Sequence, residues 1–426
     1  MNKENKKNFD WNERKISQFI IWDLVSILQK NESGDLLDAF ILDYRNAAQK
    51  HDKYKFVIDF LDELYNNLIH KLFVKRNENN KKILFHCGSK YPSIILKANK
   101  HYAVKTTANG KSDRLFALEN FIGYVNTADL NRFIYNYLTQ KDDKNLYELL
   151  NRVEKKIKSI GPDCIVLSND FLPIERAIVL VSKKIGIPTI VIQHGIFQSV
   201  SQFADGKVAD YIFAWGQYFK DLYIKKSMKE PRDVYILGYP QLIEKNKEQR
   251  IVKDYYTIYY LGSNFEKYNK KLLSIKLKTI RGINRICAKI GMKFIYRFHP
   301  GDDRKLLKTK LPEVTFAPQK EKLTETFHRG DVFISFNSTS LVEAAIRSKV
   351  ALQLMNFPRK TDNFEELGAC NKSFQTIDEL ENYLTKIANS PNLDNFKSRL
   401  NNNYIELSYD PGKRFLEILD DISKKQ

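Results

Sequence analysis

A strand, a helix and a second strand follow one another in "DCIVLSNDFLPIERAIVLVSKKIGIPTIVIQHG", residues 163–195. Both "CIVL" and "TIVI" are short runs of strand-forming residues, and the segment between them has the apolar spacing of a helix. Two strands connected by a helix of this length lie parallel, with a right-handed crossover. The stretch therefore predicts one unit of a Rossmann-like sheet.

The same unit recurs on both sides of this stretch. It is present in "KKILFHCGSKYPSIILKANK" (81–100), in "DYIFAWGQYFKDLYI" (210–224) and in "DVYILGYP" (233–240). After a Lys-rich connector it starts again at "YYTIYYLGSN" (255–264) and continues through "KFIYRFHPGDD" (293–303), "VTFAP" (314–318), "VFISFNSTSLVEAAIRSK" (332–349) and "ALQLMN" (351–356). We expect an α/β protein with two Rossmann-like domains facing a cleft, formed by residues 79–240 and 241–375.

The two ends of the chain have a different character. Residues 1–78 space their apolar side chains by three and four, which predicts a helical cap. From about Thr376 the sequence is polar and helical, without a further strand pattern. We expect a C-terminal helical tail over residues 376–426.

The charge of the chain is strongly basic. Its 426 residues include 70 Lys and Arg against 51 Asp and Glu, a formal net charge of +19. This excess attracts polyanions, anionic lipid head groups or phosphorylated small molecules, or it is simply a solvated basic surface. The sequence has no arginine-rich arm, zinc-finger spacing or RNP-like aromatic pattern, so we expect no nucleic-acid partner.

Cysteine usage and hydropathy narrow the cellular setting. The four cysteines, Cys87, Cys164, Cys287 and Cys370, form no CxxC pair, which predicts neither a zinc site nor a disulfide framework. No apolar h-region follows the charged start, and no uninterrupted apolar run reaches about 18 residues. We expect a cytoplasmic protein, with peripheral attachment to an anionic inner membrane face as a further hypothesis.

Polar residues follow the predicted strands of the C-terminal domain, where ligands bind in open α/β sheets. One strand ends in a group of hydroxyl and amide side chains, Asn337, Ser338, Thr339 and Ser340. Hydroxyls and backbone N–H groups at a helix start form an anion site, although plain N-capping is the alternative. Glu343, one turn further, is placed either to accept hydrogen bonds from ribose or to complete a capping box.

A second strand of this domain ends in "RFHPGDD". We expect Pro300 to fix the turn and His299 to face the cleft, where an imidazole stabilises charge on a leaving phosphate. A structural histidine is the alternative. Gly262 and Ser263 form a short turn after a third strand and are further candidates for ligand contact. The chain matches neither GxGxxG nor a P-loop, and it contains no metal-ligand cluster.

Two candidates for a general base follow strands of the N-terminal domain. His194 comes after "TIVIQ" and Asp170 after "CIVLSN", and either is suited to take a proton from a sugar hydroxyl. For His194, a core imidazole bonded to a carbonyl is the alternative. Gly195 would allow close approach of a backbone or ligand. Arg176, with Glu175, either orients Asp170 or pairs on the surface; the loop residues Gly88 and Ser89 are further candidates on the acceptor side.

Taken in order, "VIQHG", "DYIFAWG…LGYP", "RFHP" and "FNSTSLVEA" resemble motifs of bacterial GT-B glycosyltransferases of surface polysaccharide synthesis. The resemblance covers about residues 80–375 and is strongest to the group of sialyltransferases, polysialyltransferases and capsule Kdo transferases, with the glycerophosphotransferases of teichoic acid synthesis more distant. In that group the His-Pro pair and the Ser/Thr-rich strand end bind the CMP part of the donor. The resemblance implies these roles for His299, Pro300, Ser338 and Thr339.

The N-terminal domain departs from that group. Many of these sialyltransferases have an acidic-acidic-Gly motif that supplies the base, and "SNDF" and "FADG" are only partial matches to it. The teichoic-acid relatives have a His-Gly at such a strand end and favour His194, whereas the sialyl and Kdo types favour a carboxylate. The base stays open between His194 and Asp170.

These observations lead to an expected function. We expect an inverting, metal-independent transfer of sugar from a nucleotide sugar to a glycan or lipid-linked acceptor, without a further cofactor; the expected donor is a CMP-activated acidic sugar, such as sialic acid or Kdo. The alternatives are a nucleoside diphosphate sugar or CDP-glycerol donor, a sugar-nucleotide epimerase of similar fold, and a non-catalytic basic scaffold that binds polyanions or membranes.

Overall fold

The computed structural model describes residues 20–21, 38, 40–49, 62–65, 81–86, 88–197, 199, 207–227, 229–241, 256–263, 271–358, 360–397 and 400–425. The chain divides into two compact units. Unit 1 comprises Met1–His194, Gln202–Leu242 and Glu406–Gln426, and unit 2 comprises Gly195–Ser201 and Ile243–Ile405. Each unit is described by itself below.

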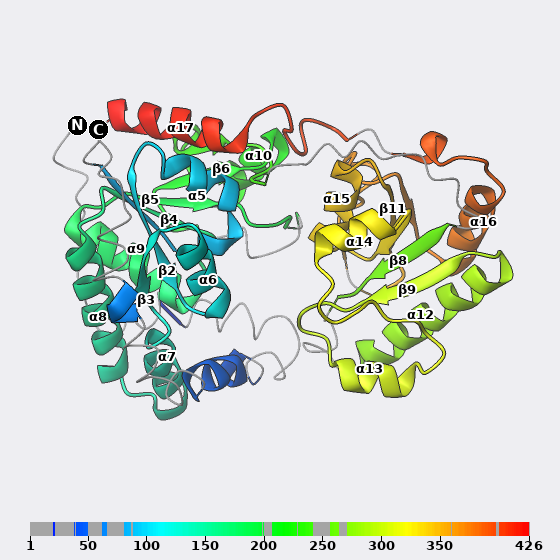
Figure 1. Cartoon of the computed structure of the whole chain (residues 1–426), viewed down its shortest axis with the longest axis horizontal. Coiled ribbons are helices and arrows are strands. Elements are labelled where there is room, and N and C mark those ends of the chain that lie inside the picture. Colours follow the sequence, from blue (N-terminus) through cyan, green and yellow to red (C-terminus); the bar gives the residue numbers. More distant parts are fainter. Residues whose placement is uncertain are drawn as a thin grey trace. The chain divides into compact units, whose positions relative to one another are not determined.

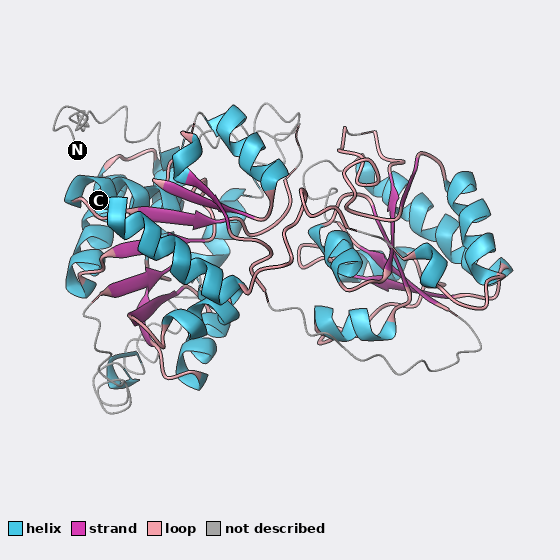
Figure 2. Ribbon diagram, turned by 90° about the horizontal axis from the view of Figure 1, so that it is seen from above, coloured by secondary structure: helices cyan, strands magenta, loops and turns pink. Residues whose placement is uncertain are grey.

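Unit 1 is built on a seven-stranded sheet in the order β3-β2-β1-β4-β5-β6-β7, in which every pairing is parallel. Its strands are β1 (Lys82–Phe85), β2 (Ala103–Ala108), β3 (Gly123–Asn126), β4 (Cys164–Leu167), β5 (Thr189–Ile192), β6 (Tyr211–Ala214) and β7 (Val234–Ile236). Figure 2 shows these strands as a twisted sheet between two layers of helices. This is the Rossmann order with one added edge strand.

Alternating side chains of the sheet supply a core on each face. In β1, Leu84 packs into a cluster with residues of the helices α7 (Leu130–Gln140), α8 (Lys144–Ile160) and α9 (Pro173–Ile185). Ile83 and Phe85 point to the opposite face, where α5 (Pro92–Ala98) and α17 (Pro411–Lys425) supply the partners. Because both faces are covered, central strands such as β1 and β4 are almost entirely apolar, which is why the sequence shows them as short hydrophobic runs.

The remaining helical segments of unit 1 lie in the connections. They are η4 (Gly88–Lys90), α6 (Lys111–Glu119), α10 (Gln217–Ser227) and η6 (Pro231–Asp233). Residues 40–49 and 62–64 are also helical, and most of the predicted cap over residues 1–78 lies outside the described residues.

Unit 2 has a five-stranded, fully parallel sheet in the order β12-β11-β10-β8-β9. Its strands are β8 (Thr257–Leu261), β9 (Lys293–Arg297), β10 (Val332–Ser335), β11 (Val350–Leu354) and β12 (Lys372–Phe374). Its helical segments are α12 (Leu272–Lys289), α13 (Arg304–Lys310), α14 (Leu323–Arg329), α15 (Thr339–Ile346), α16 (Ile377–Ala388) and η7 (Asp394–Phe396). A parallel bridge between Tyr296 and Phe316 extends the sheet beyond β9, at the predicted "VTFAP" strand.

The prediction of two Rossmann-like α/β domains is confirmed, and one predicted boundary is corrected. The predicted tail of residues 376–426 is not a separate element, because residues 376–405 belong to unit 2 and the rest belongs to unit 1. Figure 1 shows α17 lying along α5, with which it packs. Phe415 and Ile418 of α17 are buried in the core of unit 1. Unit 1 is therefore assembled from segments that are distant in sequence.

The structure also bears on membrane attachment. Among the described residues, no helix is both long and apolar enough to cross a bilayer. Peripheral attachment stays a prediction.

Candidate functional site

The strand order of each sheet marks the place where a ligand would bind. In unit 1 the order reverses between β1 and β4, and in unit 2 it reverses between β8 and β10. Open α/β sheets bind ligands outside the carboxyl ends of the strands at such a point. In unit 2 these ends carry Gly262 and Asn337, which the sequence predicted, and in unit 1 they carry His86 and Ser168.

In unit 2 the chain leaves β10 through a capped helix start. Ser338 is the N-cap of α15, and its Oγ accepts a hydrogen bond from the Ser340 N–H at 3.2 Å. The capping interpretation is therefore correct for Ser338. The residues from Asn337 to Ser340 remain only half-buried, and the positive end of the helix dipole lies here. Glu343 is half-buried on the same helix, and its predicted contact with ribose stays a prediction.

The segment that follows His194 belongs to unit 2. The Ile196 N–H donates to Thr339 Oγ1 at 3.2 Å. A Cβ at Gly195 would lie 3.0 Å from the same oxygen, so this glycine allows the segment to approach α15 closely. Further along, the Ser199 N–H donates to Asp362 Oδ2 at 2.6 Å, and the Ser199 hydroxyl donates to the other carboxylate oxygen. Thr339 thus has a structural contact within unit 2, and its role in donor binding stays a prediction.

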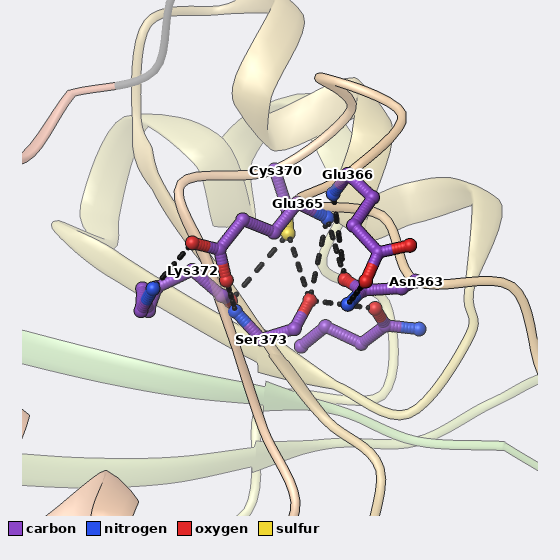
Figure 3. A network of polar contacts seen from close by, with 7 residues as sticks. Asn363, Glu365, Glu366, Cys370, Lys372 and Ser373 are labelled. Carbon is purple, nitrogen blue, oxygen red and sulfur yellow. Dashed lines mark hydrogen bonds and ion pairs between the residues drawn. The ribbon is translucent and has the colours of Figure 1, made fainter.

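Asp362 lies next to a network of polar contacts between β11 and β12. The Gln353 amide donates to the Asp362 carbonyl at 2.9 Å, and its oxygen accepts from the Ser373 hydroxyl at 2.9 Å. Figure 3 shows Glu365 contacting both Lys372 and the backbone of Ser373. Burial raises the pKa of the neighbouring Cys370 thiol to about 12, so this cysteine is a protonated packing residue.

The turn after β9 is organised by a buried ion pair that the sequence analysis missed. Asp302 accepts from the Lys276 ammonium at 2.8 Å, from the Tyr296 hydroxyl at 2.9 Å and from the His299 N–H at 2.8 Å. The side chains of Lys276 and Asp302 are 2% and 0% exposed. Lys276 also donates to the Ser263 carbonyl at 2.7 Å. The ion pair therefore joins the turn after β8 to the turn after β9.

This arrangement determines which nitrogen of His299 carries a proton. The Gly301 N–H donates to His299 Nδ1 at 3.0 Å, so Nδ1 is the acceptor and Nε2 carries the proton in the neutral ring. His299 is half-buried and Pro300 is exposed beside it. Gly262 packs so closely against the turn that a Cβ would lie 2.8 Å from Asp302 Oδ2 and 2.9 Å from the Arg297 carbonyl.

In unit 1, His194 is exposed beyond the end of β5. The pKa of its imidazole is lowered to about 4, first by desolvation and then by the ammonium groups of Lys90 and Lys207. The two ammonium groups disfavour the protonated ring by charge repulsion, in addition to the loss of hydration. A hydrogen bond to the Ser168 backbone opposes the shift. The ring donates to that carbonyl, and in the neutral form the other nitrogen carries a lone pair.

Asp170 is fully buried, unlike His194. It accepts from Lys207 Nζ at 2.7 Å and from the backbone N–H groups of Val208 and Ala209 at 2.6 and 2.9 Å. Burial alone raises the pKa of this carboxyl, but Lys207 and the backbone donors outweigh burial and lower it. A buried, fully bonded carboxylate of this kind is not placed to receive a proton from a substrate. The structure therefore does not favour Asp170 as the base.

A buried polar network occupies the switch point of unit 1. The His86 ring contacts Thr107 Oγ1 at 2.9 Å, and its Nε2 lies 3.6 Å from Glu175 Oε1. Glu175 also accepts from the Asn169 amide at 3.2 Å. Burial raises the pKa of Glu175, but His86 and Asn169 lower it more. Neither Glu175 nor Arg176 pairs on the surface, because their residues are only 5% and 4% exposed; this burial does not favour the predicted acceptor contact of Arg176.

The loop after β1 is likewise tied to its surroundings. The Ser89 hydroxyl donates to Asp113 Oδ1, so Ser89 already has a partner within unit 1. Lys90 is the next residue, and the sequence analysis did not single it out. Its Nζ lies 3.3 Å from Ser168 Oγ. Gly88 begins the short helical turn η4. Among the described residues, no group of three or more His, Cys, Asp and Glu side chains is arranged to hold a metal ion.

Comparison with known proteins supports the fold and leaves the activity open. No protein-family model matches the sequence, and no curated protein matches it. The UDP-GlcNAc 2-epimerase of Methanocaldococcus jannaschii is similar in structure, with 16% identity, 80% of this chain and 100% of that chain covered, and a TM-score of 0.55. The fold is of the GT-B type.

Two further solved structures extend this likeness. The UDP-GlcNAc 2-epimerase of Neisseria meningitidis, solved with UDP-GlcNAc bound, has 16% identity and a TM-score of 0.56 over 81% of this chain and 100% of its own. A glycosyltransferase of Rickettsia africae ESF-5 has 10% identity and a TM-score of 0.50 over 82% and 100%. The GT-B fold thus accommodates both sugar transfer and sugar epimerisation.

Proposed function

We propose that this protein is a glycosyltransferase, with the nucleotide sugar bound by unit 2 and the acceptor hydroxyl deprotonated by unit 1. One observation carries the proposal: the two carboxyl edges expose opposite chemistry. Unit 2 presents hydrogen-bond donors at a helix start and on His299, and unit 1 presents a histidine with a lone pair. A transfer to a hydroxyl needs one such base and one such cluster of donors.

The donor phosphate is assigned to the edge between β8 and β10. The start of α15 offers backbone N–H groups and the hydroxyls of Ser338, Thr339 and Ser340. His299 Nε2–H adds a further donor, since Nδ1 accepts the Gly301 N–H. These groups stabilise the negative charge that develops on the phosphate when the bond to the sugar breaks.

His194 is assigned as the base. In the reaction the acceptor oxygen forms a bond to the anomeric carbon, the hydroxyl proton moves to His194, and the bond from that carbon to the phosphate breaks. The electron pair of the broken bond leaves with the nucleotide. Attack opposite the leaving group inverts the anomeric configuration. A lowered pKa keeps His194 neutral, and therefore able to accept a proton, at neutral pH.

For the donor we propose a CMP-activated acidic sugar, on the resemblance of the His299-Pro300 and Asn337–Ser340 motifs. A UDP-sugar donor is the competing possibility, because a structural neighbour of 16% identity was solved with UDP-GlcNAc bound.

A 2-epimerase is the second candidate function, favoured by a structural match that covers the whole of two such enzymes and 80% and 81% of this chain. Inverting a carbon centre requires groups that remove a proton and return one at that carbon. At the described carboxyl edge of unit 1, the carboxylates of Asp170 and Glu175 are buried and bonded, and His194 is exposed. This distribution favours transfer to an acceptor.

The test combines binding and turnover. We expect CMP to raise the melting temperature of the protein more than UDP, CDP or GDP, and His299→Ala to lose that gain while the exposed-residue control His328→Ala keeps it. Stabilisation by UDP instead would overturn the donor assignment, and the absence of any nucleotide effect would overturn the function.

Turnover separates the two activities. With the stabilising nucleotide sugar, His194→Gln should lower turnover about 10²–10⁴-fold without changing nucleotide binding, and His101→Gln should match the wild type. Release of the 2-epimer in place of sugar transfer would establish the epimerase.

A further inference from the structure

Lys90 is an exposed cation beside the proposed base. Lys90 lies in the loop after β1, and its Nζ is 3.3 Å from Ser168 Oγ. The backbone of the same residue, Ser168, is hydrogen-bonded to the His194 ring. Among the described residues, no carboxylate forms an ion pair with Lys90. Its charge therefore faces solvent without a described counter-ion.

Lys207 is a second cation near the same ring, and it is fixed in place. Its ammonium lies 2.7 Å from Asp170 Oδ1 and 5.2 Å from the centre of the Phe171 ring. Phe171 in turn lies 6.4 Å from the His194 ring, centre to centre. The ion pair orients Lys207, and the Phe171 ring lies near both the Lys207 ammonium and the His194 ring.

The two lysines produce a positive potential at His194. They are the two charges that act most strongly on its ring, and both lower its pKa. Glu175 opposes them more weakly. The ammonium of Lys207 is already paired with Asp170, whereas Lys90 is exposed, so Lys90 is the cation that is available to a ligand.

We propose that the acceptor carries an anionic group, a phosphate or a carboxylate, next to the hydroxyl that reacts, and that Lys90 binds this group. The inference rests on the proposed function and names the class of its second substrate. It follows from one cation beside the base and does not depend on the net charge of the chain.

An anionic acceptor would also activate the base. In the free protein Lys90 and Lys207 disfavour the protonated imidazole. An anion bound to Lys90 offsets that effect, so the basicity of His194 rises when the acceptor arrives. The proton then moves from the acceptor hydroxyl to a stronger base than the free protein contains.

The experiment follows the His194 ring by NMR in the full-length protein labelled with ¹³C-histidine, assigned by the resonance that His194→Gln removes. Three probes of similar size are titrated: glycerol 3-phosphate, glycerate and glycerol. We expect one or both anions to shift the His194 resonance and raise the midpoint of its titration, and glycerol to do neither. Lys90→Gln should weaken anion binding about tenfold, the loss expected for one charge-assisted hydrogen bond, and the exposed control Lys100→Gln should bind as the wild type does.

Equal responses to glycerol and to both anions, or equal affinities of Lys90→Gln and wild type, would overturn the inference. A response to glycerol 3-phosphate alone assigns a phosphate, and a response to both anions assigns either group. Nucleotide melting shifts measured on the same preparations test unit 2 separately. If the anion binds through Lys90 but no nucleotide raises the melting temperature, the anion site would stand and the proposed function would be wrong.

Discussion

The two units each contain a buried lysine–carboxylate pair at the carboxyl edge of the sheet, and each pair stabilises a different loop. In unit 1, Lys207 and Asp170 lie 2.7 Å apart, and in unit 2, Lys276 and Asp302 lie 2.8 Å apart. Both carboxylates are fully buried and both accept backbone N–H groups. Asp170 fixes the approach to β6 and holds a cation near the proposed base, whereas Asp302 shapes the turn that presents His299.

The comparison teaches that an acidic residue at a strand end is not by position a catalytic one. At these edges the carboxylates shape the backbone, and two histidines with assigned hydrogen bonds remain for chemistry. Breaking each pair should therefore have a similar cost in stability and a different consequence for ligand binding.

Removing either lysine is expected to have the largest effect. Lys276→Met and Lys207→Met each leave a buried carboxylate without its cation, which costs about 3–5 kcal/mol of unfolding free energy. Only Lys276→Met should also abolish nucleotide stabilisation, because the turn that carries His299 depends on Asp302. Urea unfolding and nucleotide titration measure the two effects.

Lys278→Met, at an exposed position on the same helix, is the control and should change neither quantity. If Lys207→Met lost nucleotide stabilisation to the same extent as Lys276→Met at matched folded fraction, the proposed difference between the pairs would be wrong.

A smaller effect is expected from the glycine that touches the unit 2 turn. In Gly262→Ala the new Cβ would meet the Tyr296 hydroxyl, Asp302 Oδ2 at 2.8 Å and a backbone carbonyl at 2.9 Å. Overpacking of this kind costs about 1–3 kcal/mol, and the displaced turn should weaken nucleotide binding. Gly110→Ala in unit 1 has open space around the new atom and changes only the N-cap of α6, so it should cost less stability than Gly262→Ala and leave nucleotide binding unchanged. Equal results for the two variants would contradict the close packing at Gly262.

The sequence predicted the fold where strands are short apolar runs and missed them where they are not. β1, β4 and β8 are nearly continuous apolar segments because both faces of the sheet are covered. β2 reads "AVKTTA", β3 reads "GYVN" and β12 reads "KSF", so their polar and small residues conceal them. The return of α17 to unit 1 is a tertiary contact that no local pattern encodes.

The site was predictable to the extent that it follows strand ends. His194, His299 and Ser338 were predicted in this way, and the structure places each of them after a strand, while their roles stay predictions. Lys276 was missed because it stands in a basic helix, and its partner Asp302 is distant in sequence. One signal was present: Lys276 shares the buried face of α12 with Ile280 and Ile283, where a lysine requires a partner. The burial of Asp170 could not be predicted, because Lys207 reaches it from another connection.

The smallest expected effect concerns pH, and it tests whether the unit 1 pair and Lys90 act on the base. If His194 is the base, as we propose, it must be neutral to accept a proton, so activity should fall as pH falls through its pKa. With the ordinary pKa of about 6.5, activity at pH 5.5 would fall about tenfold. With the pKa lowered to about 4, the ring stays almost entirely neutral and kcat/KM should hardly change.

Lys90→Gln removes one of the two cations and should move the acid limb of the kcat/KM profile to higher pH, whereas Lys100→Gln should not. The profile of kcat reports the acceptor-bound protein, in which an anionic acceptor raises the pKa, so its acid limb should lie above that of kcat/KM. An acid limb at pH 6.5 in kcat/KM of the wild type would show that the two lysines do not act on the catalytic base.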